Sequence, residues 1–171
     1  VRVPMATGTV TTFEASLDRL DVDWTHTTRE GFADVLQEVA TEPAVGTPLP
    51  LDISLPDWVN TNPTPRELDA ATTGITAAGL GIAAYGSVLL PSTPEGTEPV
   101  SLFPDLHVAV LRVDDVVPGM VEAFEFIGGE FRDGDHSSAI IATGPSATAD
   151  MGELVRGAHG PKDVHVVMLD E

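Results

Sequence analysis

Hydrophobic residues in the first third of this chain recur at helical spacing. Two stretches have apolar positions three or four residues apart, which predicts two helices. Those positions are Phe13, Leu17 and Leu20 in the first stretch, and Phe32, Val35, Leu36 and Val39 in the second. The first helix is predicted over residues 11–20. The second follows Thr27-Thr28-Arg29-Glu30, which has the form of a helix capping box.

The next segment, residues 42–63, is rich in proline, aspartate and asparagine. This composition predicts an irregular segment, with one short strand at 51–55. Thr64-Pro65-Arg66-Glu67 then begins another helix. It offers a threonine as N-cap, a proline at the first helical position and a glutamate at the third.

Short apolar runs alternate with helical patterns in the second half. The predicted strands cover 82–90, 106–113, 138–143 and 164–169; the predicted helices cover 118–126, introduced by Asp114 or Asp115, and 149–158. A proline-rich loop is predicted at 91–99. Strands that alternate with helices are typical of a mostly parallel sheet with helices on both faces. We therefore expect an α/β fold.

The length of 171 residues suits one compact domain. Aromatic residues make up only 5% of the chain, so the core must be aliphatic. We expect a single domain over 1–171, with a helical and irregular part at 1–63 and an α/β core at 64–171. The stretch Ala70 to Pro94 carries no charge, but its glycines and prolines favour a buried turn of helix followed by a buried strand over a membrane span.

The charge balance limits the partners that the protein can bind. There are 27 acidic residues against 8 basic ones, a formal net charge of −19. Nucleic acid and anionic membranes require a positive surface, so neither is expected as a partner. Because the acids are spread along the chain, we interpret them as the solvated surface of a salt-adapted, halophilic protein. The first five residues lack the layout of a signal peptide, and we expect a cytoplasmic location.

This hypothesis predicts that the melting temperature rises with molar KCl, because salt screens repulsion between the surface carboxylates. A thermal denaturation series in KCl measures the effect. A melting temperature that stays flat or falls would contradict salt adaptation.

Candidate chemistry is limited by what the sequence lacks. There is no cysteine, which excludes thiolate-bound metals, clusters held by this chain's own thiolates and cysteine nucleophiles. The five histidines show no metal-binding spacing, so no metal or cofactor is expected in this chain. There is also no G-x-S-x-G motif of a serine hydrolase. Gly79 to Ala84 matches a dinucleotide-binding pattern, but it precedes a strand where that motif must follow one.

The segment from Gly144 to Asp150 follows a predicted strand and begins a predicted helix. Ligands of open α/β sheets bind beyond the carboxyl ends of strands, and free N–H groups at a helix start attract anions. An alternative is purely structural: Ser146 or Thr148 caps the helix, and Asp150 complements its dipole. Nine residues of helix would place His159 about 13 Å from Asp150, at the helix end. His107 begins a strand and points either into a cleft or to its rim.

Several of these residues together resemble a known family. Gly144-Pro145-Ser146-Ala147-Thr148-Ala149-Asp150-Met151, followed by Gly157-Ala158-His159-Gly160-Pro161, is similar to the C-terminus of the LUD-domain family, the lactate-utilisation protein C-like proteins. Gly74-Ile75-Thr76-Ala77, Ile82 to Ser87 and Leu102 to Val108 fit earlier segments of its pattern. The resemblance covers about residues 65–170.

The resemblance implies a fold of the NagB/RpiA/CoA-transferase-like group. It also implies an accessory role in the oxidation of L-lactate to pyruvate, beside partner subunits that carry iron–sulfur clusters. The ligand-binding residues that it favours are Gly86, Ser87, His107, Gly144, Pro145, Ser146, Thr148, Asp150 and His159. We also expect self-association as a homodimer, through an interface that the sequence does not specify.

One departure and one alternative remain open. Ala84 and Tyr85 stand where the family usually has an acid and a threonine, which puts any role of that acid in doubt. The alternative function is a small-molecule-binding protein or enzyme of the sugar-phosphate-isomerase or CoA-transferase type. No residue matches the catalytic glutamate of a true CoA-transferase, so whether the chain is an enzyme stays open.

Overall fold

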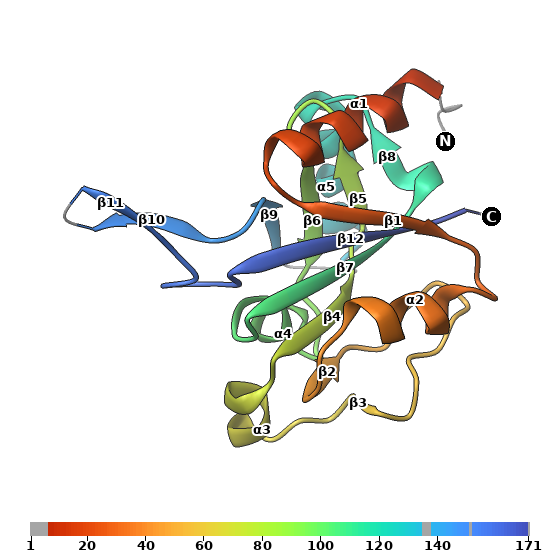
Figure 1. Cartoon of the computed structure of the whole chain (residues 1–171). Coiled ribbons are helices and arrows are strands. Elements are labelled where there is room, and N and C mark those ends of the chain that lie inside the picture. The colour runs from red at the N-terminus through yellow and green to blue at the C-terminus, as the bar shows by residue number, and fades with distance from the viewer. Residues whose placement is uncertain (1–6, 135–137, 151, 171) are drawn as a thin grey trace.

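The computed structural model describes residues 7–134, 138–150 and 152–170. Two sheets pack face to face, and helices lie both beside the core between them and on their outer sides (Figure 1). A third, two-stranded sheet projects from this body as a hairpin (Figure 1).

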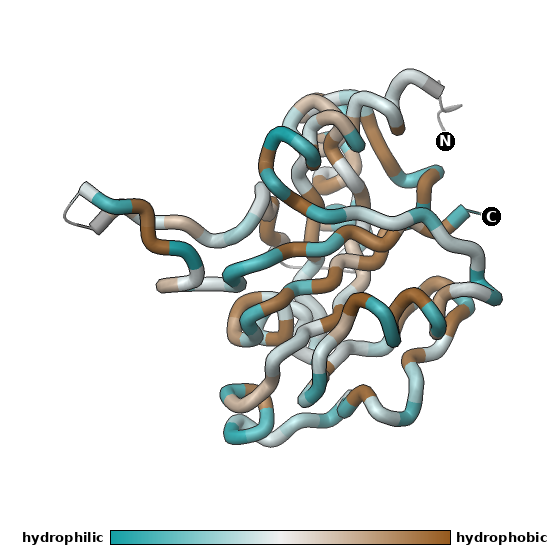
Figure 2. Tube along the Cα trace, viewed as in Figure 1, coloured by the Kyte–Doolittle hydropathy of each residue, from teal (hydrophilic) through white to brown (hydrophobic). Residues whose placement is uncertain are grey.

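The larger sheet has six strands, and every neighbouring pair in it is parallel. Its order is β1 (Asp23–Thr27), β12 (Asp163–Leu169), β7 (Leu106–Arg112), β4 (Thr73–Ala77), β2 (Ala44–Gly46) and β3 (Val59–Asn60). The central strands are apolar on both faces, as a parallel sheet covered on both sides requires. Figure 2 shows hydrophobic residues concentrated along these strands.

The second sheet is mixed and has four strands. Its order is β8 (Val116–Val117), β5 (Leu80–Ile82), β6 (Ser87–Pro91) and β9 (Ala139–Thr143). Val88 and Leu90 of β6 face the larger sheet and join one core cluster with Leu111 and Met168. Leu89 faces the other way, so each strand serves two cores.

Five helices complete the layers. They are α1 (Thr7–Arg19), α2 (Phe32–Val39), α3 (Pro65–Ala70), α4 (Thr97–Leu102) and α5 (Met120–Asp133). Phe13 of α1 packs between the two sheets, whereas Phe32 of α2 covers the opposite face of the larger sheet. Ala123 of α5 covers the outer face of the mixed sheet. None of the described helices is long and apolar enough to cross a bilayer.

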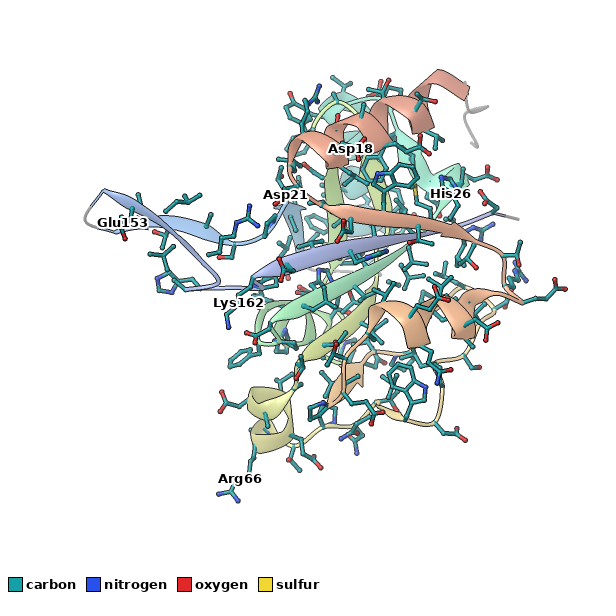
Figure 3. The ribbon with its side chains drawn as sticks, viewed as in Figure 1. Asp18, Asp21, His26, Arg66, Glu153 and Lys162 are labelled. Atoms are coloured by element: carbon teal, nitrogen blue, oxygen red, sulfur yellow. The ribbon has the colours of Figure 1, made fainter. Side chains whose placement is uncertain are left out.

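The projecting hairpin consists of β10 (Ala147–Asp150) and β11 (Glu153–Arg156). Gly152, with φ of +85°, lies in its turn. Figure 3 shows Glu153 far out on the hairpin, and Lys162 near its base, where the chain returns to β12. Only Arg156, 3.0 Å from Asp21 Oδ2, makes a described ion pair from the hairpin to the body.

Most elements predicted from apolar spacing are confirmed. The structure has helices α1, α2 and α5 and strands β7, β9 and β12 where the pattern predicts them, with α5 extending to Asp133. The predicted cap of α3 is also present: Thr64 Oγ1 accepts a hydrogen bond from the Glu67 N–H, and the Glu67 carboxylate accepts one from the Thr64 N–H. The α/β class and the parallel sheet with helices on both faces are confirmed as well.

The predicted helix at 149–158 is wrong, because this segment forms the β10–β11 hairpin. Gly152 and Gly157 both adopt the left-handed region, which favours glycine and interrupts a helix. There is consequently no helix for Ser146 or Thr148 to cap, no helix dipole for Asp150 to complement, and no helix end at His159.

Four smaller predictions are also wrong. No strand forms at 51–55, where flanking prolines remove backbone donors. Gly31, not the predicted capping box, precedes α2. The predicted loop at 91–99 holds the start of α4, and Gly119, not an aspartate, is the N-cap of α5.

The uncharged stretch from Ala70 to Pro94 contributes three strands and no turn of helix beyond the last residue of α3. They are β4, β5 and β6. The predicted strand 82–90 is divided into β5 and β6 by a tight turn that ends at Gly86, where φ is +65°. The strand β1, with the polar sequence DWTHT, was not predicted.

Gly74 of β4 gives a test of this packing. A Cβ atom there would collide with the carbonyl oxygen of Val100 in α4, whereas a Cβ on Gly129 of α5 would meet nothing within 4 Å. We expect Gly74→Ala to lower the free energy of unfolding by about 1–3 kcal/mol. Gly129→Ala is expected to raise it by about 0.5–1 kcal/mol, because alanine is the better helix former. Urea denaturation of both variants measures this, and equal stability of the two would contradict the close approach of α4 to β4.

Candidate functional site

A pocket of about 360 Å³ opens between the two sheets. It lies at the amino-terminal ends of β7 and β12, beside α4 and the loops on both sides of the hairpin. Its lining residues are Leu90, Ser101, Leu102, His107, Ile140, Ala142, Thr143, Gly144, Pro145, Ser146, Ala147, His159, Gly160, Pro161 and Val164. The loop that begins at Gly144 does follow the carboxyl end of a strand, but that strand is β9 of the mixed sheet.

The pocket brings together five of the nine residues proposed from the sequence. They are His107, Gly144, Pro145, Ser146 and His159. Ser87 lies one residue behind the lining, because its Oγ is 2.7 Å from Oγ1 of Thr143.

Gly86 and Thr148 are not among the described lining residues, and only the backbone of Asp150 is described. Gly86 packs against α1, where a Cβ would come within 2.9 Å of the Ser16 carbonyl carbon. Thr148 and Asp150 belong to β10, opposite Val155 and Glu153 of β11.

Backbone hydrogen bonds hold the two loops of the pocket against each other. The Ser146 N–H donates to the Pro161 carbonyl over 2.9 Å, and the Gly157 N–H donates to the Ser146 carbonyl over 2.9 Å. Gly160 approaches Ser146 so closely that a Cβ on it would lie 2.9 Å from the Ser146 Cβ. Gly144 has φ of +67°, which favours glycine at this turn. These contacts join the two motifs, which the hairpin separates in sequence, into one wall of the pocket.

His107 and Ser101 are the most buried polar residues of the described lining, each 2% exposed. His107 is the second residue of β7, and its Nε2 lies 2.9 Å from Oγ1 of Thr76 in β4. Burial lowers the pKa of His107 to about 4, because the charged imidazolium would lose its hydration. The imidazole is therefore neutral at pH 7.

The rest of the lining carries little charge. Among the described residues that form it there is no aspartate, glutamate, lysine or arginine. The nearest basic side chain along the chain, Lys162, pairs with Asp105 over 2.9 Å. No group of three or more potential metal ligands occurs within the described ranges. The chemistry available in the pocket is therefore hydrogen bonding by hydroxyls, imidazoles and backbone groups between apolar walls.

Sequence reasoning missed two parts of the lining. Gly160 and Pro161 were within the quoted motif but were interpreted as the end of a helix. Ser101 and Leu102 belong to α4, which begins within the predicted loop at 91–99 and ends on the first residue of the Leu102–Val108 motif. Their proximity in sequence to His107 was the available signal.

The two residues that depart from the family pattern lie outside the described pocket lining. Ala84 and Tyr85 are exposed in the turn between β5 and β6, and neither is among the described lining residues. The replacement of the usual acid and threonine thus leaves the pocket wall unchanged.

Comparison with known proteins finds a family and several relatives. The family model described as "LUD domain" matches residues 4–169. A lactate utilization protein C from Deinococcus radiodurans is 34% identical over 106 residues, which cover 60% of this chain and 49% of that protein. One from Bacillus licheniformis is 35% identical over 109 residues, which cover 61% and 45%. The chain thus matches about half the length of these curated relatives.

A solved structure has the same fold. The crystal structure of a DUF162 family protein from Deinococcus radiodurans superposes with a TM-score of 0.71 and covers 98% of this chain and 100% of that chain, at 20% sequence identity. Since the family model extends over nearly the whole sequence, the resemblance inferred from the motifs is confirmed, and the chain belongs to the LUD domain family.

Proposed function

We propose that this protein is an accessory component of a cytoplasmic lactate-utilisation system, in which partner subunits with iron–sulfur clusters oxidise L-lactate to pyruvate. The observation that carries the proposal is the match to the LUD domain over residues 4–169, together with relatives named lactate utilization protein C. The chain has no cysteine to bind an iron–sulfur cluster, which supports the proposal that the partner subunits hold the clusters.

The same proposal assigns the pocket as the ligand site of this component. Support comes from the two family motifs, Gly144–Ser146 and His159–Pro161, which form one wall although the hairpin separates them in sequence. The volume of about 360 Å³ is near the lower end of the ~300–1,000 Å³ range of small-molecule sites. We further propose that residues 1–171 form one LUD-like domain of the NagB/RpiA/CoA-transferase-like group.

An enzyme of the sugar-phosphate-isomerase or CoA-transferase type is the second candidate function. The pocket is compatible with it, since an enzyme needs a cavity for its substrate. Two observations count against it: the described lining has no carboxylate to serve as nucleophile, and no lysine or arginine to bind a phosphate. We therefore prefer the accessory role with a bound small molecule.

Growth on lactate tests both parts of the proposal. Deleting the gene in its native host is expected to abolish growth on L-lactate but not on pyruvate, and the wild-type gene restores it. Ala142→Leu fills part of the pocket from β9 and is expected to reduce the growth rate on lactate by more than half. Ala149→Leu is the matched control, because Ala149 is exposed on the hairpin and does not line the pocket.

The outcomes separate the two parts. A deletion strain that grows normally on lactate contradicts the role in lactate utilisation. A strain that needs the gene but grows equally well with Ala142→Leu and Ala149→Leu contradicts the pocket as the functional site. Thermal denaturation of both purified variants checks that each is folded.

A further inference from the structure

The hydroxyl of Thr76 determines which nitrogen of His107 carries the hydrogen. Thr76 is fully buried in β4, and its described hydrogen bonding is to His107 Nε2 alone. A buried hydroxyl must donate its hydrogen to some acceptor, and here only Nε2 is available. Nε2 is therefore the acceptor, and the neutral ring carries its hydrogen on Nδ1.

Nδ1–H is then a donor without a partner. Among the described residues no group bonds this nitrogen, and the pocket is the open space that the His107 ring borders. Nδ1 is not one of the buried side-chain atoms that lack a partner, so solvent in the pocket reaches it. The pocket therefore offers a hydrogen-bond donor to an occupant that presents an acceptor at this point.

The surroundings decide which kind of acceptor fits. An anion in the pocket would meet no lysine or arginine among the described lining residues, and His107 itself stays uncharged because burial lowers its pKa to about 4. His159 is exposed, so water screens any charge that it carries. A carboxylate taken from water into such a site is strongly destabilised, whereas a neutral carbonyl oxygen is not. The net charge of −19 adds to the repulsion of anions.

We infer that the pocket binds an uncharged carbonyl compound whose oxygen accepts the hydrogen bond of His107 Nδ1–H, and whose apolar part packs between Leu90, Ile140 and Val164. The inference rests on the proposal that this pocket is the ligand site, and it names the class of ligand. It excludes free lactate and free pyruvate as the molecules bound here. The protein would then serve lactate oxidation by binding a neutral molecule other than the oxidised acid.

Two probes that differ in charge test this ligand class. Methyl benzoylformate and benzoylformate share a phenyl ring and a 2-oxo group, but only the second is an anion at pH 7. Each is titrated into the full chain labelled with ¹⁵N-histidine, and the imidazole resonances of His107 and His159 are followed by NMR. We expect the ester to shift the Nδ1 resonance of His107 saturably, with a Kd at least about tenfold lower than that of the anion.

Two threonine variants test the role of the hydrogen bond. Thr76→Val removes the hydroxyl that holds the hydrogen on Nδ1, and we expect it to weaken binding of the ester about tenfold. Thr25→Val is the matched control: Thr25 Oγ1 lies 2.9 Å from Nε2 of His165, in an equivalent pair of β1 and β12 that is not part of the described lining. We expect this variant to bind the ester as the wild type does.

Three results would overturn the inference. They are equal or tighter binding of the anion, an unchanged His107 resonance with both probes, and equal loss of ester affinity in the two threonine variants. The growth assay keeps the underlying site proposal separate. If Ala142→Leu fails to support growth on lactate while neither probe shifts His107, the ligand class is wrong and the site stands.

Discussion

The hydrogen bond between Thr76 and His107 is the interaction on which the pocket depends. It joins β4 and β7, two central strands of the parallel sheet, and both side chains are almost fully buried. Because the register aligns Gly74 with His107, the two bonded residues lie diagonally on the same face of the sheet. Gly74 lacks a side chain on that face, and this allows α4 to approach and complete the pocket wall. The position of the His107 imidazole thus depends both on the hydrogen bond to Thr76 and on the close packing of α4 against β4.

The pocket also requires the contact between the two sheets. The larger sheet supplies His107 and Val164, while the mixed sheet supplies Leu90, Ile140 and Ala142. The described lining thus combines residues of both sheets with the loops at the base of the hairpin. This arrangement also explains why the pocket is at the amino-terminal ends of the parallel strands.

The sequence predicted those parts of the fold that local patterns determine. Strands β7, β9 and β12 are mainly apolar, and helices α1 and α2 have helical spacing of their apolar residues. Both kinds of pattern can be recognised within a few consecutive residues. The family motifs identified most of the pocket, including His107 and Ser146.

The hairpin was missed because alanine, leucine and glutamate favour a helix, while the left-handed turn at Gly152 and the pairing of β10 with β11 override that preference. Strand β1 was missed because it is polar and is stabilised by pairing with distant β12. Thr76 was not proposed as a partner of His107, since 31 residues separate them and only the parallel register brings them together.

The protonation state of His107 in the unliganded protein tests the central claim most directly. ¹⁵N NMR of the imidazole between pH 4 and pH 8 reports both its charge and the nitrogen that bears the hydrogen. The account predicts a neutral ring with the hydrogen on Nδ1 from pH 8 down to about pH 5, with protonation only as the pH approaches about 4. A ring that protonates near its ordinary pKa of about 6.5, or that carries its hydrogen on Nε2 at pH 7, would contradict it.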